Sequence, residues 1–285
     1  SMGMTPIGDV VVNGERRSAD DASVRMDDAG LLRGYGCFEA VRTYSGVAFR
    51  LGEHLTRLEA SAAAMGLPLP PRSDLEAWCM DRAAVGDVVV RVVVTSGSDL
   101  DNLGTDAATL VFAHEAAPRP DSMRLFEVVA PWHPAGEPTE LAAVKTLSYA
   151  PNTAALLHAR AEGFDDAVLL DVETTVLELP MASIGWVIDG VIETPSLDLG
   201  ILRSVTRNAM IEVAGNLDLP VAEGIFPSAR LHAADEAFVM STTKEIVPVV
   251  AIGTRTYDPG PFTQALFAGF RELVAAEVAG STRSG

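Results

Sequence analysis

The sequence predicts a mixed α/β protein with a smaller N-terminal domain and a larger C-terminal domain. Runs rich in β-branched residues, such as 88–95, alternate with stretches whose apolar residues recur at helical spacing, such as 53–65. The 285 residues are 48% hydrophobic and 21% charged, which suits two folded domains of modest size. Proline gathers at 118–121. We therefore expect this stretch to link domains at 1–117 and 122–285.

Turn and cap signals justify the elements of the first domain. Asn13-Gly14 is typical of a tight hairpin turn, and Ser45-Gly46 is expected to turn the chain between two strands. In the longer helix the apolar residues fall on one face, and Gly66 ends it. The expected strands are 10–12, 38–44, 47–51, 88–95 and 109–113, and the expected helices are 53–65 and 74–84.

The second domain alternates strands and helices. Asp189-Gly190 is a strong hairpin signal within an apolar run at 184–192. Gly163 is typical of a helix end, and Leu266 and Phe270 lie at helical spacing in the last helix. The expected strands are 125–129, 167–170, 184–192 as a hairpin, 237–240 and 246–252, and the expected helices are 153–162, 202–213 and 262–278.

Charge and composition exclude several classes of partner. A net charge of −18 and a sequence pI near 4.6 argue against nucleic acid, whose phosphates need a basic surface. No apolar run reaches the roughly 18–20 residues that span a bilayer, so no membrane partner is expected. The five histidines do not pair at metal-ligand spacing, so no metal site is expected. Cys37 and Cys79 cannot form a disulfide framework, and we expect a cytoplasmic protein.

Lysine usage singles out one candidate residue. Lys145 and Lys244 are the only lysines, although Lys and Arg together number 21. Arginine can replace lysine on a solvated surface but not in amine chemistry, because a guanidinium stays protonated. A lysine in such a chain is therefore a candidate for chemistry, and a solvent-exposed surface lysine is the alternative. The sequence contains no phosphate-binding loop, nucleophile elbow or His-Glu-x-x-His motif.

Five sequence features follow one another along the chain. Arg57 comes first, then Val-Lys-Thr-Leu-Ser-Tyr-Ala-Pro-Asn at 144–152, Glu178 before a hairpin, Gly-Ile-Leu-Arg-Ser-Val-Thr-Arg at 200–207, and Ser-Thr-Thr-Lys-Glu-Ile-Val-Pro at 241–248. In this order they resemble the class IV pyridoxal-phosphate enzymes, which include branched-chain aminotransferases, D-amino-acid aminotransferases and 4-amino-4-deoxychorismate lyases. The resemblance implies the fold type IV arrangement of two α/β domains, pyridoxal 5'-phosphate as cofactor, a small-molecule amino substrate, and a homodimer.

The resemblance also implies the cofactor-binding residues. It makes Lys145 the Schiff-base lysine and the proton-transfer base, and Glu178 the carboxylate that keeps the pyridine nitrogen protonated. Arg57 matches the arginine that binds the cofactor phosphate, a planar fork suited to that anion; a helix-surface ion pair is the alternative. Lys244 falls at a position where the family does not require lysine.

Two further segments complete the implied phosphate site. Val205 and Thr206 open a helix whose backbone N–H groups and dipole favour an anion. Thr242 matches a hydroxyl donor to the phosphate, although a threonine before a strand is also a common cap. The backbone around Thr243 is expected to face the substrate carboxylate.

The substrate-side residues are implied by position. Tyr35, Phe38, Arg91 and Tyr149 fall where relatives line the pocket. Arg91 is expected either to bind a carboxylate or to be a strand arginine paired with an acid. The two aromatic residues Phe38 and Tyr149 could equally belong to the core. Tyr35 stands where lyases and D-amino-acid enzymes usually carry aspartate.

Three functions remain open on the sequence. The segment around Lys145 most resembles that of 4-amino-4-deoxychorismate lyases, which favours release of 4-aminobenzoate and pyruvate in the folate pathway. The alternative is an amino-acid aminotransferase of branched-chain or D-amino-acid type, which uses the same lysine, glutamate and phosphate site. A cofactor-free binding protein on the same fold is disfavoured, because it would need neither Lys145 nor Glu178.

Overall fold

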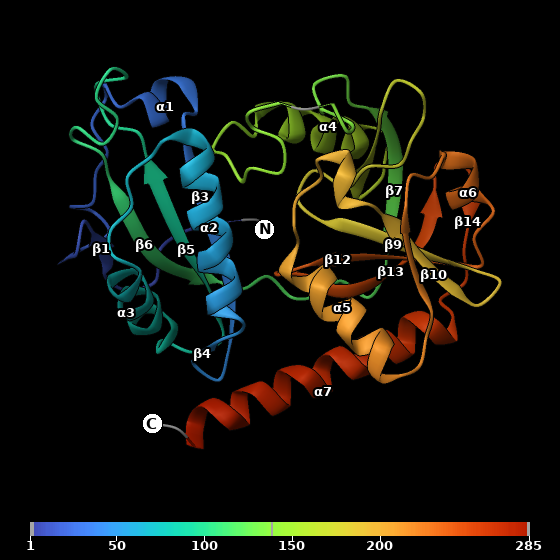
Figure 1. Ribbon diagram of the computed structural model, residues 1–285. Helices are drawn as coiled ribbons and strands as arrows, with labels where there is room; N and C mark the ends of the chain where they lie inside the picture. The colour runs from blue at the N-terminus through green and yellow to red at the C-terminus, as the bar shows by residue number, and fades with distance from the viewer. Residues whose placement is uncertain (1–2, 138, 284–285) are drawn as a thin grey trace. The chain divides into compact units, whose positions relative to one another are not determined.

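A computed structural model describes residues 3–137 and 139–283 (Figure 1). The chain forms two compact units. The first contains the residues up to Ala117, the segment Val144–Tyr149 and the chain from Val274 on. The second contains Pro118–Ala143 and Ala150–Leu273. The segment that carries Lys145 therefore packs with the first unit. The sequence had placed this lysine in the C-terminal domain. The expected division into domains at 1–117 and 122–285, with a linker at 118–121, otherwise stays a prediction.

The first unit is built on an antiparallel sheet of six strands, in the order β2-β1-β6-β5-β3-β4. Its strands are β1 (Val10–Val12), β2 (Glu15–Arg17), β3 (Gly36–Tyr44), β4 (Val47–Ala48), β5 (Val88–Thr95) and β6 (Thr109–Glu115), and its helices are α1 (Ala29–Arg33), α2 (Leu51–Met65) and α3 (Arg72–Ala83).

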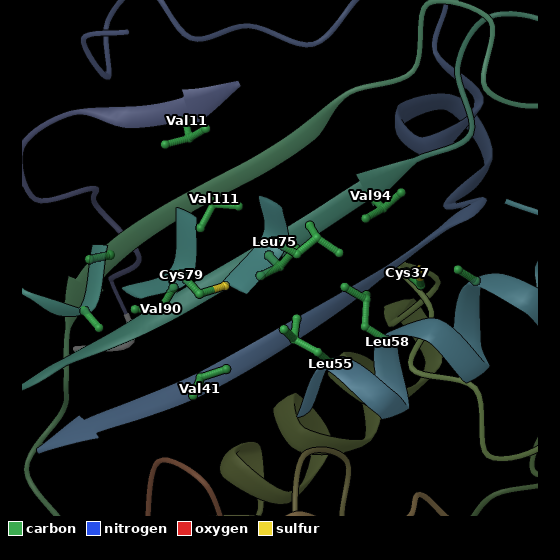
Figure 2. Packing of buried hydrophobic residues seen from close by; sticks show 14 of the residues in the cluster. Val11, Cys37, Val41, Leu55, Leu58, Leu75, Cys79, Val90, Val94 and Val111 are labelled. Atoms are coloured by element: carbon green, nitrogen blue, oxygen red, sulfur yellow. The ribbon is translucent and has the colours of Figure 1, made fainter. Parts of the chain in front are cut away.

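The core of the first unit lies between this sheet and the helices α2 and α3. Figure 2 shows Leu55 and Leu58 of α2 beside the valines of the sheet, with Leu75 of α3 on the same face. All three leucines are fully buried. Burial of each such side chain contributes roughly 1.5–3 kcal/mol, so this face fixes both helices on the sheet. Strand β3 and helix α2 also carry the polar residues Glu39, His54 and Arg57, which are described below.

The second unit contains an eight-stranded mixed sheet in the order β11-β10-β9-β12-β13-β7-β8, with β14 paired to β13. The pairs β10–β11, β13–β7 and β7–β8 are parallel, and the others are antiparallel. The strands are β7 (Met123–Val129), β8 (Asp166–Leu170), β9 (Ser183–Ile188), β10 (Val191–Pro195), β11 (Val221–Gly224), β12 (Glu236–Ser241), β13 (Glu245–Ile252) and β14 (Arg255–Thr256). The helices are α4 (Ala150–Ala161), the short 3-10 helix η1 (Leu197–Leu199), α5 (Val205–Asn216), α6 (Ser228–His232) and α7 (Pro261–Arg283), of which the part from Val274 on belongs to the first unit.

The strongest local signals produced the expected elements. Asn13-Gly14 and Asp189-Gly190 both form hairpin turns with positive φ at each residue, as a two-residue turn of this kind requires. The strand expected at 47–51 is wrong beyond Ala48: Arg50 adopts a left-handed conformation, and α2 begins at Leu51. The helix expected at 202–213 begins only at Val205, because the Ser204 side chain caps it by accepting the Arg207 N–H.

The sequence interpretation missed four short elements of the second unit, η1, β11, α6 and β14. The strand β11 pairs in parallel with β10, and α6 follows it. Both are four or five residues long, too short for a periodic pattern to appear. In the described part of the chain, no helix is both long and apolar enough to cross a bilayer.

Candidate active site

The lysine segment is held against the start of β3 in the first unit. The Phe38 N–H donates to the Lys145 carbonyl at 3.0 Å, and the Leu147 N–H donates to the Gly36 carbonyl at 2.8 Å. The Lys145 N–H donates to the Ser61 hydroxyl of α2 at 3.2 Å. The segment therefore continues the hydrogen bonding of the sheet, which fixes the backbone from which the Lys145 amine projects.

The glycines on either side of Tyr35 make room for this segment. A Cβ on Gly36 would lie 2.5 Å from the Val94 carbonyl and 2.6 Å from Leu147, and one on Gly34, which has a φ of +67°, would lie 2.6 Å from Ser148. Residues with side chains would therefore push the lysine segment away. Tyr35 itself, a predicted substrate residue, donates its hydroxyl to the Met65 carbonyl at the end of α2.

Two predicted aromatic residues surround the Lys145 amine. The Nζ atom lies 4.5 Å from the centroid of the Phe38 ring and 5.8 Å from that of Tyr149. The two rings contact each other edge to face, with centroids 5.3 Å apart. Phe38, Tyr149 and Lys145 are all half-buried. The amine thus lies against a wall of aromatic carbon, as expected if Phe38 and Tyr149 line a pocket.

Arg91 of β5 contacts the same aromatic wall. Its guanidinium carbon is 5.6 Å from the Phe38 centroid, and its Nε donates to His114 Nε2 at 3.1 Å. His114 is neutral in this arrangement, because its Nδ1 must carry the proton that bonds the Glu115 carbonyl. Among the described residues no carboxylate contacts Arg91. Burial lowers the pKa of Arg91, so this cation is held in a desolvated place without an anion.

Arg57 is part of a buried cluster that the sequence interpretation did not identify. Its Nε and Nη2 donate to the two oxygens of Glu39 at 2.6 and 2.8 Å, and His54 Nδ1 lies 2.8 Å from Glu39 Oε2. Burial alone would raise the pKa of Glu39, but Arg57 and His54 hold it well below its ordinary value. Burial lowers the pKa of His54 despite the neighbouring carboxylate.

The second unit places Glu178 between two donors. The Leu202 N–H donates to Glu178 Oε2 at 3.2 Å, and His133 Nε2 lies 3.3 Å from Glu178 Oε1. Glu178 is 15% exposed and His133 9%. The chain after β8 returns beside that strand, with Leu177 and Leu179 buried on either side of Glu178. His133, from the loop after β7, was not among the predicted residues.

The start of α5 is a second feature of this unit. Ser204 caps the helix, and Val205 and Thr206 supply its first backbone N–H groups, which have no partner within the helix. Thr206 is buried. An anion placed at this end would meet both the N–H groups and the helix dipole.

The turn between β12 and β13 holds the remaining predicted residues. Thr242 and Thr243 are half-buried in this turn, which the Ser241 hydroxyl closes by accepting the Lys244 N–H. The Lys244 amine lies 3.7 Å from Asp166, a buried carboxylate whose pKa burial raises. Lys244 is therefore used in an ion pair.

The predicted residues thus form separate groups within the two units. The structure brings together Lys145, Phe38, Tyr149 and Arg91 in the first unit, with Tyr35 packed at the end of α2. In the second unit, Glu178 accepts the N–H of Leu202, three residues before α5 begins. The sequence interpretation did not identify Glu39, His54, His114 and His133, which contact these predicted residues or their partners. No motif or composition feature of the sequence points to them.

Known proteins resemble this chain along most of its length. The family model "Amino-transferase class IV" matches residues 36–252. A putative branched-chain-amino-acid aminotransferase of Methanocaldococcus jannaschii is 32% identical over 93% of this chain and 96% of its own, and a D-alanine aminotransferase of Listeria monocytogenes is 33% identical over the same shares.

The fold is shared as well. The structure of a branched-chain aminotransferase of Thermoproteus uzoniensis with norvaline superposes with a TM-score of 0.84 at 30% identity, over 94% of both chains. A hypothetical aminotransferase of Mycobacterium tuberculosis in its PLP-bound form shares the fold, with a TM-score of 0.87 at 23% identity, over 95% of this chain and 100% of its own. Since the family model covers most of the chain and the relatives match nearly all of it, the chain is a pyridoxal-phosphate-dependent enzyme of the class IV aminotransferase family.

Proposed function

We propose that this enzyme is an amino-acid aminotransferase of the branched-chain or D-amino-acid type. The observation that carries the proposal is the group formed by the Lys145 amine, the Phe38 and Tyr149 rings, and Arg91. It combines an amine for cofactor chemistry, an apolar wall for an aliphatic side chain, and a cation for a carboxylate. The relatives named above are aminotransferases, which favours this function over the lyase that the lysine segment resembles.

The residues present fit pyridoxal 5'-phosphate. The cofactor needs an amine for its aldehyde, an acid for its ring nitrogen and donors for its phosphate. Lys145 supplies the amine, and three hydrogen bonds fix the backbone of its segment. Glu178 supplies the second. Each of its oxygens is held by a neutral donor, so no cation among the described residues of the second unit offsets its charge. The N-terminus of α5 and Thr242 supply the third.

Each residue then has a definite task. When bound, pyridoxal phosphate supplies an aldehyde that reacts with amines and a ring that accepts electrons. Lys145 would hold the cofactor and, once the substrate amine has displaced it, its Nζ would take the proton from the substrate Cα and return it to the former aldehyde carbon of the cofactor. Glu178 keeps the ring nitrogen protonated. Arg57 is assigned to the phosphate, although Glu39 already offsets its charge, so it would contribute directed N–H donors more than net charge.

Arg91 is assigned to a carboxylate of the substrate. A half-buried guanidinium bound to a neutral histidine lacks the anion that normally offsets such a charge. A keto acid or amino acid brings that anion when it binds, and the Phe38 ring contacts both Arg91 and the Lys145 amine. The backbone at Thr243 is assigned to the substrate carboxylate in the second unit. We also propose a homodimer, which sedimentation of the purified enzyme tests; a cytoplasmic location stays a prediction.

One assay separates the candidate functions. The purified enzyme, loaded with cofactor, is supplied with 2-oxoglutarate and either L-leucine or D-alanine, and separately with aminodeoxychorismate alone. We expect formation of glutamate in the first assay, dependent on both the amino donor and the keto acid. Release of 4-aminobenzoate and pyruvate without any keto acid, together with no transamination of either amino acid, would overturn the proposal in favour of the lyase. The preferred amino donor decides between the branched-chain and D-amino-acid types.

A further inference from the structure

His133 is held in one orientation by its own loop. The Ala135 N–H donates to His133 Nδ1 at 3.1 Å, and the His133 backbone N–H donates to the Ala130 carbonyl at 3.0 Å. The ring is nine-tenths buried. The loop therefore fixes both the position of the imidazole and the face that it turns toward Glu178.

The Ala135 contact also fixes the protonation of this ring. A nitrogen that accepts a hydrogen bond carries no proton, so His133 Nδ1 is bare and Nε2 holds the single proton of a neutral imidazole. That Nε2–H faces Glu178 Oε1 at 3.3 Å. A second proton on the ring would point an N–H at the Ala135 N–H, which is repulsive. His133 is thus a donor to Glu178 and not its counter-ion.

Glu178 receives its second hydrogen bond from the backbone. The Leu202 N–H holds Oε2, so each oxygen of the carboxylate has one neutral donor. Two donors stabilise the ionised form and restrict rotation of the group, while leaving its negative charge to a cation from outside. A donor pair of this kind suits a carboxylate whose task is to hold a proton on a neighbouring base.

We propose that His133 is a positioning residue for the cofactor ring: its Nε2–H keeps Glu178 ionised and aimed at the pyridine nitrogen. The inference rests on the proposed function, which assigns Glu178 to that nitrogen. The proton shared by the carboxylate and the ring nitrogen stays on the nitrogen only while the carboxylate is the weaker base. Loss of the His133 donor strengthens Glu178 as a base and moves the proton toward it.

Three variants test this role. His133→Leu removes the donor at similar volume, and His133→Gln replaces it with an amide N–H. His232→Leu is the matched control, because His232 also contacts a glutamate of the same unit, Glu127, at 2.9 Å, but on the surface. Each protein is reconstituted with cofactor that carries ¹⁵N in the pyridine ring. The ¹⁵N shift reports protonation of the ring nitrogen, and titration of the cofactor-free protein gives the cofactor Kd.

We expect the ring nitrogen of His133→Leu to lose its proton at lower pH than in the unaltered enzyme. The cofactor Kd should rise about tenfold and kcat should fall about tenfold, as for a lost hydrogen bond to a charged group. His133→Gln should stay within about threefold of the unaltered enzyme in both quantities. Ring-nitrogen protonation and Kd in His133→Leu that match those of His232→Leu would overturn the proposal, and so would a glutamine variant as impaired as the leucine variant.

A fourth variant separates failure of this inference from failure of the proposed site. Glu178→Gln should leave the ring nitrogen unprotonated whether or not His133 has a role. If Glu178→Gln leaves the nitrogen protonated, the assignment of Glu178 is wrong, and the role of His133 falls with it. If Glu178→Gln removes the proton and His133→Leu does not, only the role of His133 is wrong.

Discussion

The two units hold their principal carboxylates in opposite ways. Glu39 of the first unit is fully buried, and its charge is offset by the Arg57 guanidinium, with His54 as a further partner. Glu178 of the second unit keeps 15% exposure, and its partners are a neutral imidazole and a backbone N–H. A carboxylate matched by an internal cation has little charge left for a ligand, whereas one held by neutral donors keeps its charge for a cation that arrives with the cofactor.

The same contrast separates two arginines of the first unit. Arg57 is matched by Glu39, and Arg91 is bound to neutral His114 and stacked on Phe38. We call a charged side chain matched when an oppositely charged side chain of the protein contacts it. Substitution of a matched residue is expected to change mainly the stability. Substitution of a charged residue held by neutral groups is expected to change mainly catalysis or substrate binding. Each prediction below breaks or sharpens that division.

The largest effect is expected at Lys145, whose amine faces aromatic carbon. Lys145→Ala removes the amine that holds the cofactor and moves the proton, so activity should fall by about 10⁴-fold or more, while the free energy of unfolding of the cofactor-free protein changes little. Borohydride reduction of the loaded enzyme followed by mass spectrometry should show covalent cofactor in the unaltered protein and none in the variant. Lys244→Ala, which breaks an ion pair with Asp166 at 3.7 Å, is the control and should keep the adduct. A trapped adduct that persists in Lys145→Ala would contradict the assignment.

The next largest effect is on stability and concerns the matched carboxylate. Glu39→Gln keeps the shape of the side chain but leaves the Arg57 guanidinium buried without its counter-charge. Removal of one partner of a buried ion pair costs about 3–5 kcal/mol, so the free energy of unfolding in urea should fall by about 3 kcal/mol.

The matched control for this change is Glu127→Gln, which breaks the half-exposed contact with His232. It should cost less than about 1 kcal/mol. An unchanged unfolding midpoint in Glu39→Gln would show that the cluster of Glu39, Arg57 and His54 does not stabilise the first unit. Arg57 would then not be matched by Glu39 in the sense used above.

The residues that the sequence identified and those that it missed differ in a physical way. Lys145 stood out because lysine is rare in this chain, and the turn at Asp189-Gly190 stood out because few residues tolerate positive φ. Glu39 and His133 gave no such signal. Their roles depend on partners that are distant in sequence, such as Arg57 for Glu39 and Glu178 for His133, and only the folded chain shows which glutamate faces a cation and which faces a neutral ring.

Fold class and the longer elements were predictable for a similar reason. Strand β5 and helix α2 carry their periodic pattern within a single segment, and both were expected. The start of α5 was placed three residues too early because its apolar pattern continues into Leu202, although Ser204 gives the N-cap signal. The substrate could not be settled, since the lysine, glutamate and phosphate donors serve a lyase and an aminotransferase alike.

Substitution of Arg91 should affect substrate binding more than stability. Arg91→Leu removes the cation assigned to the substrate carboxylate, which should raise the KM for 2-oxoglutarate about thirtyfold, the equivalent of about 2 kcal/mol. Arg124→Leu is a matched control, because Arg124 also stacks on a phenylalanine ring, Phe164, at 4.9 Å, but in the second unit. Equal KM values for the two variants would place Arg91 with the structural arginines.

The smallest effect is a pH dependence of stability that comes from the matched cluster. Burial lowers the pKa of His54, so the folded protein keeps this ring neutral at a pH where the unfolded chain binds a proton. Below the ordinary histidine pKa of about 6.5 the unfolded state therefore takes up more protons, and stability must fall as the pH falls. The carboxylate of Glu39 acts in the same direction, but only at lower pH, because its contribution is full above the ordinary glutamate pKa and its folded pKa lies well below it.

Between pH 7 and pH 5 the unaltered protein should lose about 1 kcal/mol more than His54→Gln, as measured by urea unfolding at each pH. Parallel curves for the two proteins over this range would show that His54 takes up its proton equally in the folded and unfolded states, and Glu39 would then face two cations at pH 5.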